Sequence, residues 1–235
     1  MSYTDTIKQN IESMQKELGV DYWKVSASGI WFRKIFDQVL NEYSEGKLLD
    51  AGAGNLLYRP MLEDRCESYE SLDISENPGL DYNQDIQNMD LNDESYDTVF
   101  CRNVLEHVRK PREAMNEISR ILKYDGKAIV SVPHLAYLHN EPEDYYRFTK
   151  YGMKEIASGS ELEIIEIREA GGLFSFIGYI FSTVLIGLTY HLPVISSILF
   201  NVNYLVQLIL SKIDSLPLLR RLTPLNYVLV YQKTE

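Results

Sequence analysis

The stretch LLDAGAGNLLYRP, residues 48–60, decides how the rest of the chain is interpreted. An apolar run ends in Asp50, and Gly52 and Gly54 follow with one residue between them. Because glycine has no Cβ, the backbone at these two positions can turn tightly and approach a ligand closely. A buried strand followed by such a turn is typical of a nucleotide site, but a glycine pair also occurs as simple turn punctuation.

Strand and helix patterns alternate after this turn. Strands are predicted over 68–75, 96–102, 126–133, 161–169 and 226–233. A helix is predicted over 111–122, with Pro111 in its first turn, and Asp125 with Gly126 predicts a turn before the next strand. This alternation favours an α/β, Rossmann-like doubly wound sheet, in which ligands bind beyond the carboxyl ends of the strands.

Four parts of the chain are predicted from these patterns. An N-terminal helical segment over 1–45, with helices at 5–18 and 30–43, precedes the α/β core over 46–169. An apolar helical hairpin over 170–223 is inserted before the last strand of the core sheet, over 224–235.

Composition narrows the possible compartments and partners. The net charge of −11 argues against binding to a nucleic-acid backbone. Cys66 and Cys101 have no paired spacing, so we expect a reduced, cytoplasmic setting and no metal site. The polar first 18 residues have no apolar signal-peptide core.

Acidic residues at the ends of two predicted strands and in the stretch QDI, residues 84–86, indicate which nucleotide would bind. The third glycine of a dinucleotide fingerprint would stand at position 57, which is a leucine. Asp50 suits a cation such as the ammonium of a bound amino acid, and Asp73 can accept hydrogen bonds from ribose hydroxyls. Asp85 can accept from an adenine amino group beside the backbone N–H of Ile86. Ammonium, ribose and adenine without a phosphate site describe S-adenosylmethionine.

Residues 47–156 resemble the class I S-adenosylmethionine-dependent methyltransferases, especially the branch found in glycan and lipid-linked sugar biosynthesis. The matching stretches are LLDAGAGNLLYRPML, SLDIS, QDI, YDTVFCRNVLEHVRKPREAMNEISRILKYDGKAIVSVP and HNEPEDYYRFTKYGMKEI. The resemblance implies the following cofactor-binding set: Asp50, Gly52, Gly54, Asp73, Ile74, Asp85, Ile86 and Asn103. Leu56 stands where many relatives keep a third glycine.

The acceptor side is expected on the segment that follows the strand 126–133. His134 is the first candidate for a general base, because an oxygen acceptor benefits from a group with a pKa near neutrality. Tyr146 is the second catalytic candidate. His139, Tyr145 and Arg147 are expected to bind the acceptor, since an arginine flanked by tyrosines suits an anionic or sugar-bearing molecule. A purely structural role for this loop is the alternative.

No charged residue occurs over the 42 positions from 170 to 211. Residues 170–235 carry a net charge of +2, against −13 for residues 1–169. The segments 173–190 and 192–211 would each form a helix of roughly 27–30 Å, near the thickness of a bilayer core. Polar residues recur along both segments, which favours a hairpin in the membrane interface over a lid or dimer contact, or a pair of membrane spans.

The sequence as a whole therefore predicts a methyltransferase acting on a small-molecule, sugar or lipid-linked acceptor. Its location would be cytoplasmic or peripheral on a membrane surface through residues 170–215, with a homodimer through the hairpin as another use of that segment. A non-catalytic, membrane-docked binding or assembly module with the same fold is the alternative. A nicotinamide-dependent oxidoreductase is disfavoured by Asp50 and by the missing glycine.

Overall fold

The computed structural model describes residues 26–189 and 193–234, so the helix predicted over 5–18 lies outside the described residues. The chain forms two compact units. Residues 36–133, 145–168 and 227–234 make the first, which we call the sheet unit. The second, the hairpin unit, comprises the described residues among 26–35, 134–144 and 169–226. Each unit has its own set of packed residues.

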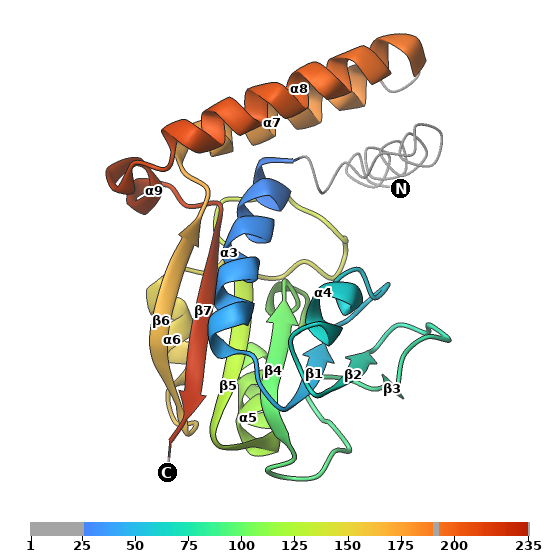
Figure 1. The fold of residues 1–235 in the computed structure, drawn as a ribbon, viewed down its shortest axis with the longest axis vertical. Helices are drawn as coiled ribbons and strands as arrows, with labels where there is room; N and C mark the ends of the chain where they lie inside the picture. The colour runs from blue at the N-terminus through green and yellow to red at the C-terminus, as the bar shows by residue number, and fades with distance from the viewer. Residues whose placement is uncertain (1–25, 190–192, 235) are drawn as a thin grey trace. The chain divides into compact units, whose positions relative to one another are not determined.

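A seven-stranded sheet in the order β3-β2-β1-β4-β5-β7-β6 confirms the predicted α/β fold. The strands are β1 (Lys47–Ala51), β2 (Ser68–Asp73), β3 (Tyr82–Asn83), β4 (Tyr96–Arg102), β5 (Leu122–Pro133), β6 (Leu162–Ala170) and β7 (Asn226–Lys233). The pairs β1–β2, β1–β4, β2–β3 and β4–β5 are parallel. Figure 1 shows β7 running against its neighbours, so the sheet is mixed. The strand order reverses between β1 and β4, which is where ligands bind in such sheets.

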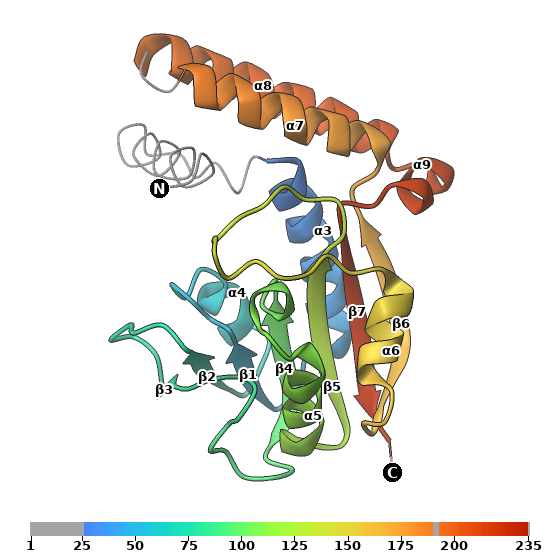
Figure 2. The ribbon, with the colours of Figure 1, turned by 180° about the vertical axis from the view of Figure 1, so that it is seen from behind.

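Helices cover the two faces of this sheet. The helical elements of the sheet unit are α3 (Ala27–Tyr43, shared with the hairpin unit), α4 (Arg59–Glu63), η1 (Leu105–His107), α5 (Pro111–Ile121) and α6 (Lys150–Ala157). In Figures 1 and 2, α5 and α6 lie on one face, and the second half of α3 lies on the other.

Apolar spacing explains why α5 packs where it does. Its buried residues Ala114, Met115, Ile118 and Ile121 recur at helical spacing and join the core beneath the sheet. Each large aliphatic side chain buried in this way contributes about 1.5–3 kcal/mol to folding. On the opposite face, Phe36 of α3 meets Phe100 of β4 edge to face, with ring centroids 5.1 Å apart.

The prediction of a turn at Asp125 and Gly126 is wrong. Both residues belong to β5, which is continuous from Leu122 to Pro133. The register against β4 shifts there, with Leu122 opposite Tyr96 but Lys127 opposite Thr98. The φ of +64° at Asp125 accommodates this bulge. The chain therefore bends within the ladder and does not leave it, a distinction that the dipeptide does not encode.

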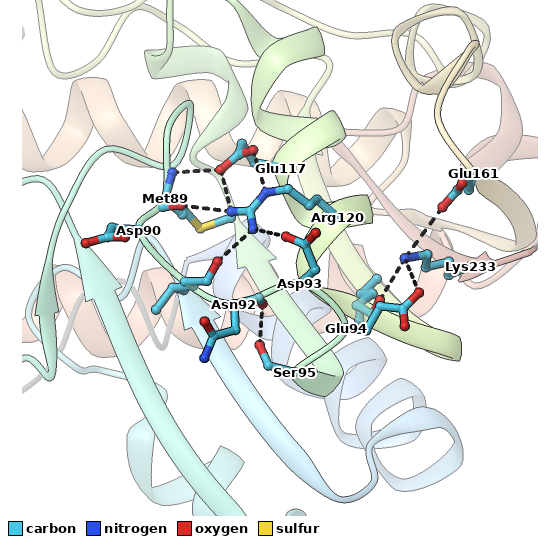
Figure 3. Close-up of polar contacts among 12 residues, drawn as sticks. Met89, Asp90, Asn92, Asp93, Glu94, Ser95, Glu117, Arg120, Glu161 and Lys233 are labelled. Carbon is cyan, nitrogen blue, oxygen red and sulfur yellow. Dashed lines mark hydrogen bonds and ion pairs between the residues drawn. The ribbon is translucent and has the colours of Figure 1, made fainter.

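Arg120 of α5 organises the end of the sheet opposite the carboxyl ends of the parallel strands (Figure 3). Its guanidinium donates to Glu117, to Asp93 and to the carbonyls of Met89 and Leu91. Nearby, Lys233 donates to the carbonyl of Leu122. A hollow of about 550 Å³ lies here, lined by Asp93, Glu94, Asn116, Ser119, Arg120, Gly159, Ser160, Glu161 and Lys233. These cations are already engaged by protein groups, so we assign the network to stability.

The hairpin unit contains α7 (Leu173–Thr189), α8 (Pro193–Ile213) and α9 (Pro217–Leu222), which stand between β6 and β7 in the chain. Helices α7 and α8 lie side by side in both views (Figures 1 and 2). Asp214 accepts hydrogen bonds from the backbone N–H groups of Phe174 and Ser175, which caps the start of α7. The indole N–H of Trp31 donates to the Ser175 hydroxyl at 3.0 Å and fixes α3 to the same end.

Polar side chains lie between the two long helices, and apolar ones face outward. Asn203 donates to the Ser182 hydroxyl at 2.9 Å, and Gln207 donates to the carbonyl of Gly178 at 2.9 Å. The exposed apolar side chains of α7 and α8 include Ile177, Ile180, Phe181, Val184, Leu185, Ile198, Val202, Leu205, Val206 and Ile209. None of the helices in residues 26–189 and 193–234 combines the length and the hydropathy that a membrane crossing requires.

Candidate active site

The turn after β1 has the backbone conformation that its glycines permit. Gly52 has a φ of +92° and Gly54 a φ of +53°. The N–H groups of Gly52 and Ala53 donate to the carbonyl of Leu72 at 2.7 and 3.0 Å, which holds the turn against β2. A Cβ on Gly52 would lie 2.1 Å from Cγ2 of Val104, so this position also needs glycine for space.

At Gly54 the positive φ, and not a lack of space, favours glycine. The nearest atom to a Cβ at this position would be Oδ2 of Asp73, at 4.0 Å, so the space over the turn is open. The backbone N–H of Gly54 donates to that same oxygen at 2.8 Å, and Asn77 donates to the Gly54 carbonyl at 2.9 Å. The turn therefore offers a backbone cradle without a side chain in it.

Leu56, at the position where relatives keep a third glycine, also adopts a left-handed conformation, with a φ of +61°. A leucine in this region costs about 1–2 kcal/mol relative to the right-handed conformation. Its N–H donates to the carbonyl of Ala53 at 2.9 Å and its carbonyl accepts from Arg59 at 3.2 Å, so the turn into α4 holds the strained residue.

Asp50 is a buried carboxylate at the carboxyl end of β1, with only 4% of its surface exposed. Its Oδ2 accepts a hydrogen bond from the Tyr69 hydroxyl at 3.0 Å. Burial raises the pKa of Asp50 to about 7, and the charge of Asp73 adds to the rise, whereas Tyr69 and Arg102 oppose it. A bound cation would stabilise the ionised form, so the residue fits the ammonium group of S-adenosylmethionine.

Asp73 ends β2 and already holds the loop around it. Besides Gly54 on Oδ2, the N–H and the hydroxyl of Ser75 donate to Oδ1. A carboxylate has about four acceptor positions, so Oδ2 keeps room for one ribose hydroxyl. The next residue, Ile74, has a side chain that is 71% exposed, which leaves an apolar surface at this strand end for a base.

Asp85 is engaged by its own loop. Its two oxygens accept from the side-chain amide of Gln87 at 3.0 and 2.9 Å, and Oδ1 also accepts from the Gln87 backbone N–H at 2.9 Å. An adenine amino group would have to displace or share with this amide. Ile86, in contrast, is buried in the main core, with 4% of its surface exposed.

Asn103, after β4, has a φ of +50°. Its N–H donates to the carbonyl of Ser131 at 2.9 Å, and its side-chain oxygen accepts from the Ser131 hydroxyl at 2.9 Å. These two bonds join the ends of β4 and β5. The guanidinium carbon of Arg102 lies 4.6 Å from the ring centroid of Tyr58, which places a cation–π pair beside the same strand end.

The Tyr145–Arg147 segment returns to the sheet unit close to η1. The N–H of Tyr145 donates to the carbonyl of Glu106 at 2.8 Å, and the Tyr146 hydroxyl donates to the carbonyl of Arg109 at 2.8 Å. The guanidinium of Arg109, a residue that the sequence did not single out, lies 5.0 Å from the Tyr145 ring. The Arg147 side chain donates to the carbonyl of Tyr146 at 2.7 Å.

His134 and His139 belong to the hairpin unit. The N–H of His134 donates to the carbonyl of Leu225 at 2.8 Å, directly after the end of β5. Nδ1 of His139 lies 3.6 Å from Oδ2 of Asp144, whose side chain is 1% exposed, and the His139 N–H donates to that oxygen at 2.8 Å. Each histidine is therefore held by groups of its own unit.

Sequence reasoning missed Tyr69, which donates to Asp50, and Val104, which closes the space at Gly52. Tyr69 stands opposite Leu48 in the parallel register of β1 and β2, so its side chain reaches Asp50 from the neighbouring strand. No local pattern marks either residue. Only the register of the two strands could have found Tyr69.

A protein-family model described as "Methyltransferase domain" matches residues 49–130, the span from β1 through the middle of β5. Residues 49–130 form a methyltransferase domain. The turn, Asp50 and Asp73 all lie inside this span. The protein is an S-adenosylmethionine-dependent methyltransferase, and S-adenosylmethionine is its cofactor.

Solved structures of methyltransferases share the fold at low sequence identity. The Burkholderia thailandensis 1,6-didemethyltoxoflavin-N1-methyltransferase, solved with its substrate and S-adenosylhomocysteine, aligns over 99% of this chain and 87% of its own, with 14% identity and a TM-score of 0.54. The Haemonchus contortus phosphoethanolamine N-methyltransferase 2 aligns over 100% of this chain and 61% of its own, with 14% identity and a TM-score of 0.59.

The same fold also serves another reaction. The cyclase SpnF aligns over 85% of this chain and 80% of its own, with 15% identity and a TM-score of 0.58. No curated protein matches this chain in sequence. Likeness at this level concerns the fold, so the acceptor must be inferred from the residues of this methyltransferase domain.

Proposed function

We propose that this methyltransferase modifies a glycan or lipid-linked acceptor that is presented at a membrane surface. When bound, S-adenosylmethionine supplies a methyl group on a positively charged sulfur, already a strong electrophile. The protein then has to align the acceptor and, for an oxygen acceptor, remove its proton. Asp50 carries the cofactor half of this proposal, because it is a buried carboxylate beside an open backbone cradle.

In the proposed site, the residues at or just after the end of each strand bind a different part of the cofactor. Asp50 holds the cofactor's ammonium, and the turn of Gly52 and Gly54 lies beneath its methionine end. Asp73 takes a ribose hydroxyl. Adenine would lie between Ile74 and the loop of Asp85 and Ile86, and Asn103 would shape the floor at the ends of β4 and β5. The exposed Ile74 and the hydrogen bond that the Ser131 hydroxyl donates to Asn103 support this arrangement.

For the acceptor, we propose His134 as the general base, with Tyr146 as the second candidate. His139, Tyr145 and Arg147 would bind the acceptor's sugar or anionic group. The support is the paired rings of Tyr145 and Tyr146, whose centroids are 6.3 Å apart, together with the adjacent arginines. Rings of this kind stack on sugar faces, while guanidinium groups pair with phosphates or carboxylates.

The proposed membrane association rests on where the polar and apolar side chains of the hairpin lie. Water-soluble helical hairpins bury apolar side chains between their helices. Here Ser182, Asn203 and Gln207 occupy that position, and the outward faces carry aliphatic and aromatic side chains. Lys212, Arg220 and Arg221 follow at the end of α8 and in α9, where they suit anionic headgroups. A homodimer through the same face is the competing occupant.

The alternative function is a membrane-docked binding or assembly module that holds the cofactor without transferring its methyl group. The cyclase SpnF, which has a related fold, shows only that the fold is not restricted to proteins named as methyltransferases. One experiment separates the two functions: incubation with S-adenosylmethionine labelled on its methyl group and a membrane lipid extract, followed by extraction of the lipids.

We expect label in a lipid-soluble product with the wild-type protein and a large loss of label, about 100-fold, with His134→Ala if His134 is the base. The control is calorimetry with S-adenosylhomocysteine, which must show unchanged affinity in that variant. Retained labelling within a few-fold of wild type would make His134 structural. Cofactor binding without any labelled product would favour the non-catalytic alternative.

A further inference from the structure

Residues 134–144, which we call the acceptor loop, pack against α7 inside the hairpin unit. The acceptor loop begins directly after β5 and carries the proposed base His134. It belongs to the same compact unit as α7, α8 and α9. Three separate sets of contacts determine its conformation, and two of them involve residues next to or on α7.

Leu225 joins the start of the acceptor loop to the start of α7. Its carbonyl accepts from the N–H groups of both His134 and Leu135, at 2.8 and 3.0 Å. Its own N–H donates to the carbonyl of Ala170 at 2.9 Å, three residues before α7 begins. A Cβ on Gly171 would lie 2.8 Å from Cγ of Leu225, so the contact is close-packed as well as hydrogen-bonded.

Tyr137 in the middle of the acceptor loop stacks on Tyr179 of α7. The ring centroids are 4.9 Å apart and the ring planes differ by 10°. Tyr179 is 8% exposed and forms a small core with Ala27 and Leu225, against which Leu135, Tyr137 and Phe176 pack. Stacked pairs of this kind contribute about 0.5–1.5 kcal/mol beyond their burial.

The far end of the acceptor loop is closed by its own residues. Asp144 accepts from the His139 N–H, and Nδ1 of His139 lies 3.2 Å from the carbonyl oxygen of Tyr137. Tyr137 is therefore contacted by α7 through its ring and by His139 through its carbonyl. Movement of the Tyr137 ring would therefore be passed to His139, a proposed acceptor-binding residue on this loop.

The remaining surface of α7 is the outward apolar face. Ile177, Ile180, Phe181 and Val184 are exposed on the same helix that contributes Tyr179, and Phe181 is 73% exposed. One rigid element thus carries both the face proposed to meet lipid and the ring on which the acceptor loop rests. A shared rigid element of this kind is what couples two binding events.

We propose that Tyr179 is a positioning residue, through which docking of α7 on a lipid surface orders the acceptor loop. This inference rests on the proposed function, because it takes the outward face of the hairpin to be lipid-binding. When lipid restrains α7, the Tyr179 ring restrains Tyr137, and the loop that bears His134 and His139 loses conformational freedom. An acceptor held in the same membrane would then meet an ordered loop.

Hydrogen exchange of the full-length protein, with and without vesicles of equal parts phosphatidylcholine and phosphatidylglycerol, tests this coupling. In the wild type we expect the amides of residues 134–144 to exchange about fivefold more slowly on vesicles. Tyr179→Leu should float with the same vesicles and show no slowing in the loop. Ile180→Leu, a conservative change on the exposed face of the same helix, should behave as wild type.

Tyr137→Leu alters the same contact from the loop side and gives a second test if Tyr179→Leu fails to fold. Slowing in Tyr179→Leu or Tyr137→Leu equal to that of wild type would overturn the proposal. So would a wild-type protein that floats while its loop exchange stays unchanged. If the wild type does not float, the membrane part of the proposed function falls as well. Binding of S-adenosylhomocysteine, measured in parallel, reports separately on the cofactor site.

Discussion

The backbone N–H of Gly54 donates a 2.8 Å hydrogen bond to Oδ2 of Asp73, which joins the turn after β1 to the end of β2. The carboxylate proposed to hold the ribose therefore also fixes the cradle beneath the methionine end of the cofactor. Removal of this one side chain acts on two parts of the site at once.

Asp73→Ala should weaken binding of S-adenosylhomocysteine by about 10- to 150-fold, because a charge-assisted bond to the ribose and the tether on Gly54 are both lost. Isothermal titration calorimetry measures the effect. The matched control is Asp64→Ala, which removes an exposed carboxylate after α4 and should leave the affinity unchanged. Equal affinities for the two variants would exclude Asp73 from the cofactor site.

Gly52→Ala should destabilise the protein by at least about 2 kcal/mol, since the new methyl group would meet Val104 at 2.1 Å. Gly159→Ala is an ideal comparison, because both glycines have a φ of +92° and nothing lies within 4 Å of a Cβ at position 159. The second variant should therefore lose only about 1 kcal/mol, for its backbone conformation. Similar losses in urea unfolding of the two variants would show that Val104 moves aside.

The raised pKa of Asp50, about 7, should make cofactor binding pH-dependent. The ammonium prefers the ionised carboxylate, so affinity for S-adenosylhomocysteine should fall as the pH drops below about 7, by up to about tenfold per pH unit. Asp50→Asn should bind weakly with little dependence on pH between about 5.5 and 7.5, because the amide does not titrate. A wild-type affinity that is flat over this interval would show that Asp50 does not meet the ammonium.

Asp50 also makes the free energy of unfolding depend on pH, but in the opposite direction to cofactor binding. Because the folded pKa of Asp50 is raised from 3.8 to about 7, the folded state binds more protons than the unfolded state between these values. Its contribution to the free energy of unfolding is present at low pH and is lost as the pH rises to about 7. Relative to Asp50→Asn, the cofactor-free wild type should therefore lose stability over that rise. Parallel unfolding curves of the two proteins across the interval would contradict this.

Arg221→Gln should weaken binding to anionic vesicles by about fivefold, since one basic residue near such a surface contributes about 1 kcal/mol. Lys154→Gln removes an exposed charge from α6 of the sheet unit and should have no such effect. Vesicle flotation measures both. If the wild-type protein stays soluble and never floats, the hairpin covers its apolar face with a second subunit or with the protein itself.

Arg120→Lys should lower the free energy of unfolding by about 1–3 kcal/mol. Lysine keeps the charge but cannot reach Glu117, Asp93 and two carbonyls at once. Arg112→Lys is the control, because Arg112 is more exposed and its hydrogen bonds go to Glu155 and to the carbonyl of Ser158. A loss no greater than that of the control would show that water replaces the Arg120 contacts.

Patterns that act within one segment were sufficient to predict much of the fold. The strands 96–102 and 226–233 and the helix that begins at Pro111 were predicted with their observed limits, or within one residue. Each is determined by local chemistry: apolar runs of β-branched residues, helical spacing, and proline at a first turn. The glycine turn after β1 was predicted for the same reason, because its positive φ values need residues without a Cβ.

Features that depend on a partner distant in the sequence could not be predicted in this way. The bond from Tyr69 to Asp50 requires the register of two strands. The bulge at Asp125 exists only because β4 and β5 resume pairing after it.

The hairpin shows the same division between sequence and tertiary structure most clearly. Its length, lack of charge and weak polar stripes follow from the residues between 170 and 211. The direction in which those polar stripes face does not follow from these residues. A stripe on one helix can face water, the sheet or the other helix with equal local propensity. Tertiary packing placed Asn203 against Ser182 and Gln207 against Gly178, where their side-chain N–H groups donate hydrogen bonds, and so turned the apolar faces outward.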